Sequence, residues 1–181
     1  MKTLLLCGYR ACDPSEPLLG TAAHADDGAT LLDHRIRQLR ALRHDVICVL
    51  AGAKADEVLR LCPRIQETEL VFDTNEPTNL MSNLRAGTFA VPNQACFVLP
   101  LEVPLVRPEV WEFLRNEYGK LGFATAHGFL RLESAPYGFP LLLSRQGVKQ
   151  LTASTPIQQL NDPALNPLVL TLPNTNSSIT I

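Results

Sequence analysis

The sequence lacks an apolar run long enough to cross a bilayer, because its longest runs, such as Val46–Ala53, fall far short of the roughly 20 residues of a spanning helix. It also lacks a strong excess of charge, since 16 basic and 18 acidic residues leave a net charge of −2. We therefore expect neither a membrane nor a nucleic acid as partner. The opening MKTLLLCGY has no signal-peptide cleavage site, and we expect a cytoplasmic protein.

The five cysteines contain no CxxC pair, and the four histidines are scattered, so the sequence offers no zinc-ligand spacing. Cys7, Cys48 and Cys96 each fall inside an apolar segment of the chain. A cysteine at such a position usually behaves as a small apolar side chain and is buried. We expect free cysteines in a reducing compartment.

Strand-like and helix-like segments alternate along the first two thirds of the chain, which is typical of βαβ units and a parallel sheet. A long loop, Gly8–Ala29, precedes a helix that begins after the N-cap Thr30. Strands are predicted at Lys2–Cys7, Val46–Leu50, Glu69–Phe72, Ala95–Leu99, Phe123–Ala126, Pro140–Leu143 and Pro167–Leu172. Further helices are predicted at Asp56–Cys62, Asn79–Ala90, Gln146–Leu151 and from Pro108 to about Tyr118.

These patterns predict an α/β fold: one domain over residues 1–181, a three-layer sandwich around a mostly parallel, Rossmann-like sheet. Ligands of such sheets bind at the carboxyl ends of the strands. Glu102 lies at such an end, as the only carboxylate in the apolar run FVLPLEVPLV. Asp73 ends another strand. Both are candidate metal ligands, and the alternative for Glu102 is a solvated carboxylate beside the helix that starts at Pro108.

Three asparagines follow the strand that ends near Asp73. Asn79 and Asn83 are four residues apart, and therefore lie on one face of the predicted helix. Together with Asn75 they are candidates for contact with a base or a ribose. The alternative is that they cap the helix or lie on its surface.

Two stretches resemble a known family. They are Asn83-Leu84-Arg85-Ala86-Gly87 and Leu99–Val106, and Pro108 then begins the next helix. On these motifs, and on Tyr137-Gly138-Phe139-Pro140, the chain from Lys2 to about Leu151 resembles the molybdenum cofactor nucleotidyltransferases. These guanylyl- and cytidylyltransferases couple a nucleotide to molybdopterin on a nucleotide-diphospho-sugar transferase fold.

The resemblance implies Mg²⁺ as cofactor, GTP or CTP as nucleotide and molybdopterin as acceptor. It places Glu102 where the family has an aspartate that binds Mg²⁺, and so implies a catalytic role for Glu102. It also implies that Gly8 belongs to the phosphate-binding loop. Arg10 is a candidate phosphate contact in that loop, or an ordinary loop arginine.

The chain departs from the family pattern in the phosphate-binding loop. Tyr9 stands at a family glycine, and Glu16 falls at or near a family lysine. Phe139 replaces a histidine, and the closing motif of the family is absent. These changes leave three alternatives open: an active nucleotidyltransferase with a rebuilt site, an inactive relative that binds a protein partner or a cofactor intermediate, and a homo-oligomeric structural protein.

Overall fold

The computed structural model describes residues 1–7, 28–51, 55–75, 79–122, 125–153, 159–160 and 162–172. The strands are β1 (Lys2–Cys7), β2 (Asp45–Ala51), β3 (Glu69–Asp73), β4 (Cys96–Pro100), β5 (Phe129–Leu132), β6 (Leu141–Leu143) and β7 (Leu168–Leu170). The helices are α1 (Leu31–Ala41), α2 (Ala55–Leu61), α3 (Leu80–Thr88), α4 (Pro108–Leu121) and α5 (Arg145–Thr152), with the 3₁₀ helices η2 (Pro63–Glu67), η3 (Pro136–Gly138) and η4 (Pro163–Leu165).

The seven strands form one sheet in the order β3-β2-β1-β4-β6-β5-β7. β1 pairs in parallel with both β2 and β4, and β2 pairs in parallel with β3. Only β6 runs against its neighbours, β4 and β5, whereas β5 and β7 are parallel. The predicted α/β fold with a mostly parallel sheet is therefore confirmed.

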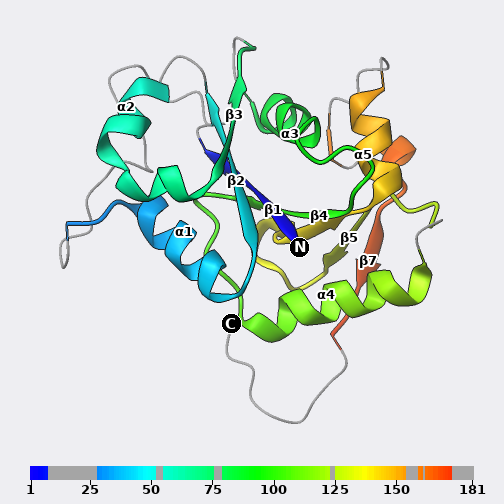
Figure 1. The fold of residues 1–181 in the computed structure, drawn as a ribbon. Helices are drawn as coiled ribbons and strands as arrows, with labels where there is room; N and C mark the ends of the chain where they lie inside the picture. Colours follow the sequence, from blue (N-terminus) through cyan, green and yellow to red (C-terminus); the bar gives the residue numbers. More distant parts are fainter. Residues whose placement is uncertain are drawn as a thin grey trace.

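Helices cover both faces of this sheet (Figure 1). α3 packs against β1, β2 and β3 and also contacts α5, and in Figure 1 both helices lie above the sheet. α1 contacts β2, while α4 contacts β5 and β6, and both helices lie below the sheet in the same view. No helix in the described ranges combines the length and the apolar character that crossing a bilayer requires.

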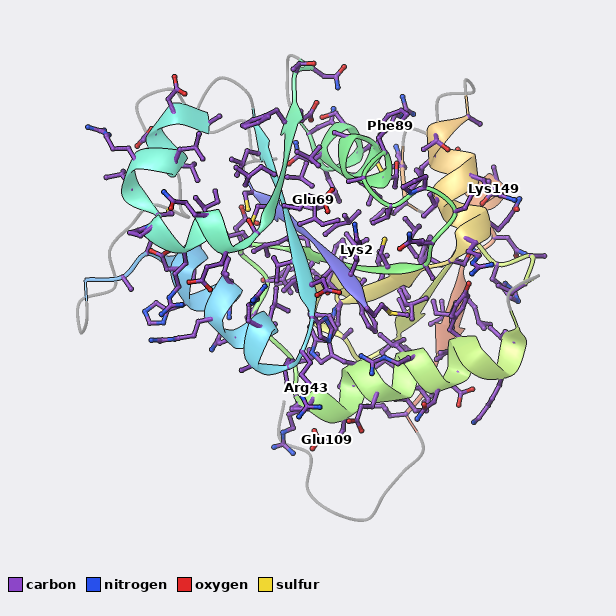
Figure 2. All side chains as sticks on the ribbon, viewed as in Figure 1. Lys2, Arg43, Glu69, Phe89, Glu109 and Lys149 are labelled. Carbon is purple, nitrogen blue, oxygen red and sulfur yellow. The ribbon has the colours of Figure 1, made fainter. Side chains whose placement is uncertain are left out.

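The amino ends of β1, β2 and β3 carry the charged residues Lys2, Asp45 and Glu69, which are partly or fully exposed. Lys2 at the start of β1 donates a hydrogen bond of 3.0 Å to Glu69 at the start of β3 (Figure 2). The two side chains remain partly exposed, at 30% and 50%. An ion pair with that much exposure contributes little to stability. We call this exposed amino edge, with Lys2 and Glu69, the charged rim of the sheet.

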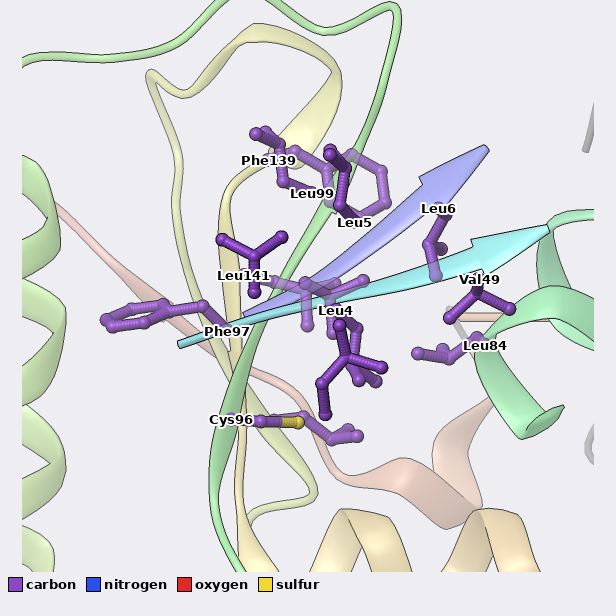
Figure 3. Close-up of a cluster of buried hydrophobic side chains, with 14 of the residues drawn as sticks. Leu4, Leu5, Leu6, Val49, Leu84, Cys96, Phe97, Leu99, Phe139 and Leu141 are labelled. Carbon is purple, nitrogen blue, oxygen red and sulfur yellow. The ribbon is translucent and has the colours of Figure 1, made fainter. Parts of the chain in front are cut away.

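The interior of the sheet is almost entirely apolar (Figure 3). Leu4, Leu5 and Leu6 of β1 are fully buried, because this inner strand is covered on both faces. Gly87 lets α3 approach closely: a Cβ there would lie 2.9 Å from a methyl group of Val49. Cys7, Cys48 and Cys96 are buried, as predicted, and Cys62 is buried as well.

The structure corrects one strand. A strand was predicted at Phe123–Ala126, but residues 125 and 126 are outside any strand, and residues 123 and 124 lie outside the described ranges. The strand in this region is β5, which begins at Phe129, three residues after the end of the predicted strand. Gly128 sets its start, because its N–H donates to the carbonyl of Leu165 at 2.6 Å, and a Cβ there would lie 2.2 Å from that oxygen.

Candidate functional site

The carboxyl ends of β1, β2, β3 and β4 lie along one edge of the sheet. The strand order reverses direction at β1, which has β2 on one side and β4 on the other. In open parallel sheets the crevice at such a reversal is the usual ligand site. We therefore expect a ligand at the carboxyl edge near β1 and β4, where Glu102 lies.

Glu102 sits in a tight turn at this edge. The N–H of Val103 donates to the carbonyl of Pro100 at 3.1 Å, and the N–H of Leu101 donates to Leu6 of β1 at 3.0 Å. Leu101 and Val103 are buried, whereas Glu102 between them is half-buried. The apolar neighbours thus hold the turn against the core, and Glu102 is the residue at its tip.

The turn that carries Glu102 lies beside the end of β1, because the N–H of Leu101 donates to the carbonyl of Leu6. The pKa of the Cys7 thiol is raised well above its ordinary value, first by a hydrogen bond with Cys48, then by burial, and in smaller part by the negative charge of Glu102. The hydrogen bond between Leu101 and Leu6 places Glu102 near the carboxyl end of β1, and Gly8 follows that strand in the sequence.

Asp73 ends β3 and is 1% exposed, and protein donors surround its carboxylate. Its Oδ1 accepts from the backbone N–H and the side-chain amide of Asn75, at 3.0 and 2.6 Å. Its Oδ2 accepts from the hydroxyl of Ser82 at 2.5 Å and from the amide of Asn83 at 2.7 Å. Burial alone would raise the pKa of Asp73, but these hydrogen bonds outweigh it and lower the pKa.

Asn79 and Asn83 have structural contacts of different kinds. Asn79 is the N-cap of α3: its Oδ1 accepts from the N–H of Ser82 at 2.9 Å, and the hydroxyl of Ser82 accepts from the N–H of Asn79. Asn83 is fully buried beneath the first turn, and its amide donates to Asp73. The structure thus brings both asparagines to the carboxyl edge, on the side of β3.

The structure does not bring Asp73 and Glu102 onto one ion. β2 and β1 separate β3 from β4, which puts the two strands about 14 Å apart at the usual spacing of about 4.8 Å. Within the described ranges, no group of three or more His, Cys, Asp or Glu side chains is arranged to hold a metal ion. Gly8 and Arg10 lie outside the described residues, and the role of each candidate residue stays a prediction.

The sequence analysis missed Ser82, which hydrogen-bonds both Asp73 and Asn79. A local signal was present. An asparagine followed three residues later by a serine is a variant of the capping-box spacing, and it marks a helix start at Asn79. The link from Ser82 to Asp73 spans nine residues and two elements, so no local pattern predicts it.

A family model described as the MobA-like NTP transferase domain matches residues 22–163. Among solved structures, the Rv0371c homologue from Mycobacterium sp. strain JC1 is 17% identical, with a TM-score of 0.67, over 94% of this chain and 85% of that one. The 4-diphosphocytidyl-2C-methyl-D-erythritol synthase from Anaerococcus prevotii DSM 20548 is 11% identical, with a TM-score of 0.60, over 99% and 90% of the two chains.

Rv0371c of Mycobacterium tuberculosis H37Rv, solved as a complex with manganese, is 16% identical, with a TM-score of 0.58. The similarity covers 94% of this chain and 87% of that one. No curated protein matches the chain. At these identities the solved structures agree with the present one in fold, which extends over almost the whole chain.

Proposed function

Because the chain belongs to the MobA-like NTP transferase domain family, we propose that it binds a nucleoside triphosphate at the carboxyl edge of the sheet and transfers its nucleotidyl group. The observation that carries this proposal is the turn at Pro100–Val103. It presents a half-buried carboxylate, Glu102, at the end of β4, next to β1, where the order of the sheet reverses.

The donor set at this edge fits Mg²⁺ bound together with a nucleotide. Mg²⁺ in such sites takes one or two carboxylates, several waters and the oxygens of the substrate phosphates, so a cage of three protein ligands is not required. Glu102 supplies one carboxylate at the strand end. When bound, the cation neutralises phosphate charge during attack on the α-phosphate. Rv0371c, solved with manganese, shares the fold and lends support to a divalent cation.

The residues of this chain have separate proposed tasks. Glu102 orients the metal-bound phosphates, and Gly8 and Arg10 contact phosphate oxygens from the loop after β1. Asn79 and Asn83 belong to the wall of the site on the side of β3. GTP or CTP is the proposed nucleotide and molybdopterin the proposed acceptor, in line with the resemblance of the motifs. The fold that this chain shares with a 4-diphosphocytidyl-2C-methyl-D-erythritol synthase lends some support to CTP.

A second candidate function is an inactive relative that binds a protein partner or a cofactor intermediate. Two observations favour it. Tyr9 and Glu16 stand where the family resemblance places a glycine and a lysine, so the loop that meets the phosphates has lost a positive charge and gained a negative one. The other candidate metal ligand, Asp73, is already surrounded by four protein donors.

Calorimetric titration of GTP and CTP, with and without Mg²⁺, distinguishes the two. We expect the wild type to bind nucleotide only when Mg²⁺ is present. In both E102A and E102Q the affinity should fall at least about tenfold, because each variant lacks the carboxylate charge that would hold the cation. E102Q keeps the shape of the side chain, so it tests the charge alone. E69A is the matched control: it removes a half-exposed carboxylate from the opposite edge of the sheet, and should bind like the wild type.

Two results would contradict the proposal. If the wild type and E102Q bound the nucleotide with equal Mg²⁺-dependent affinity, Glu102 would not be a ligand of the cation. No binding by a wild type that melts cooperatively would favour the inactive relative.

A further inference from the structure

The lone pairs of the Asp73 carboxylate are already taken up by hydrogen bonds from protein donors, which leaves none for a cation. Two carboxylate oxygens offer about four lone-pair directions. Four donors occupy them: the N–H and amide of Asn75, the hydroxyl of Ser82 and the amide of Asn83, at 2.5 to 3.0 Å. A metal ion would have to displace neutral donors that make short contacts with a side chain that is 1% exposed.

These donors come from both sides of one connection. Asn75 follows β3, whereas Ser82 and Asn83 belong to the first turn of α3. Asp73 therefore ties the chain that leaves β3 to the helix that returns onto the sheet. Ser82 extends the link outward, because its hydroxyl donates to Asp73 and accepts from the N–H of the N-cap Asn79.

The part of α3 that follows its first turn packs closely against the sheet. Leu84, which follows Asn83, is fully buried, and Gly87 allows the next turn to lie against Val49 and Leu4. The body of α3 is thus fixed by packing, while its first turn combines the partial packing of Leu80 and Met81 with the capping box and the hydrogen bonds to Asp73. Removing that carboxylate should release Asn75 and loosen the first turn, and leave the body of the helix in place.

We propose that Asp73 is a positioning residue, which holds Asn75 and the first turn of α3 in place as the wall of the site beside β3. The inference rests on the proposed function for its effect on nucleotide, but it assigns Asp73 a different task from metal binding. Asp73 acts through Asn79 and the first turn, and it touches neither the cation nor the phosphates.

A swap across the hydrogen bond between Asp73 and Asn83 gives the sharpest test. D73A removes the carboxylate, and D73N keeps its shape but loses its charge. The double variant D73N/N83D exchanges carboxylate and amide, and so keeps a charged hydrogen bond between β3 and α3. E69A, at the other end of the same strand, is the control.

Hydrogen exchange measured by mass spectrometry reports how firmly the first turn of α3 is held, and it needs no nucleotide. We expect D73A to speed exchange by about tenfold in peptides that cover residues 74–83, with peptides from β1 and β4 unchanged. In the nucleotidyl-transfer assay we expect KM for the nucleotide to rise about tenfold while kcat changes far less. D73N/N83D should restore both values toward the wild type, and E69A should change neither.

Three results would overturn the inference. They are unchanged exchange over residues 74–83 in a folded D73A, faster exchange spread evenly over the whole chain, and a loss of Mg²⁺ dependence in D73A equal to that in E102A. If D73A does not fold, S82A removes a single donor and is judged by the same criteria. If the wild type binds no nucleotide, the proposed function fails, and exchange alone decides whether Asp73 is the anchor.

Discussion

Two buried titratable side chains, Asp73 and His44, show how differently the two ends of the sheet are built. Asp73 at the carboxyl edge has four polar donors around it. His44 lies near the amino ends of β1 and β4, where its Nδ1 is 2.6 Å from the hydroxyl of Thr3 and its ring packs against Phe97 and Trp111 at centroid distances of 5.4 and 4.9 Å.

The pKa is lowered in both, with opposite results. Hydrogen bonds keep Asp73 charged, although burial opposes them. For His44, burial lowers the pKa to about 4, and the nearby charges of Arg115 and the chain's amino group add to the effect, so the imidazole is neutral near pH 7. The amino end thus buries a neutral ring as part of the core, whereas the carboxyl edge maintains a charge at the place where a ligand is expected.

The largest effect should come from the aromatic cluster. W111A removes a side chain that is 1% exposed and contacts both His44 and Phe97. We expect the free energy of unfolding to fall by about 3–5 kcal/mol. Urea unfolding followed by circular dichroism measures it, since the variant lacks the single tryptophan of the chain. A loss below about 1 kcal/mol would show that this cluster is not part of the core.

The second effect concerns pH and follows from His44. Its pKa is about 4 in the folded protein and about 6.5 when unfolded, so between these values the unfolded chain binds more protons. Stability present above pH 6.5 should therefore be lost as the pH falls, by about 3 kcal/mol at pH 4.

The difference between the wild type and H44Q isolates this effect from carboxylates that titrate in the same range. The unfolding free energy of H44Q should depend less on pH by that amount, whereas H34Q, on the half-exposed side of α1, should follow the wild type. Parallel pH profiles for the wild type and H44Q would contradict the assignment.

A smaller effect is expected at the carboxyl edge. S82A removes a hydrogen bond to the charged Asp73 and part of the cap of α3, which should cost about 1–3 kcal/mol. S134A, at an exposed position in a turn, is the matched control and should lie within about 0.5 kcal/mol of the wild type. If chemical denaturation cannot separate the two variants, the network around Asp73 contributes no net stability.

The smallest effect is expected at the charged rim. E69A breaks the ion pair with Lys2, and we expect a loss of at most about 1 kcal/mol that shrinks further at high salt. Thermal melting at low and high ionic strength measures both quantities. A loss as large as that of S82A would erase the contrast between the rim and the anchored edge.

Local signals in the sequence predicted most of the elements. The strand Lys2–Cys7 is observed with the predicted bounds, and Thr30 caps α1 through a capping box with Asp33. Apolar runs and caps are encoded within a few residues, which explains this success. β5 was misplaced because its position depends on Gly128, whose backbone meets Leu165, 37 positions away along the chain.

At the candidate site, too, the sequence predicted the local features but not the contacts between distant residues. The sequence placed Glu102 and Asp73 at strand ends, because each directly follows or ends an apolar run. It did not reveal that the two lie on strands separated by two others, since strand order is a property of the whole sheet. Nor did it reveal the donors around Asp73, which come from residues two, nine and ten positions later.

The antiparallel β6 has a consequence for folding during synthesis. β4 pairs with β1, but its other side is closed only by β6, more than 40 residues later in the chain. Until Leu141–Leu143 leave the ribosome, the strand Cys96–Pro100, which is buried along its whole length in the final fold, has an open edge. An open apolar edge is a template for pairing with other chains. Slow synthesis of residues 101–140 should therefore increase aggregation of the nascent protein.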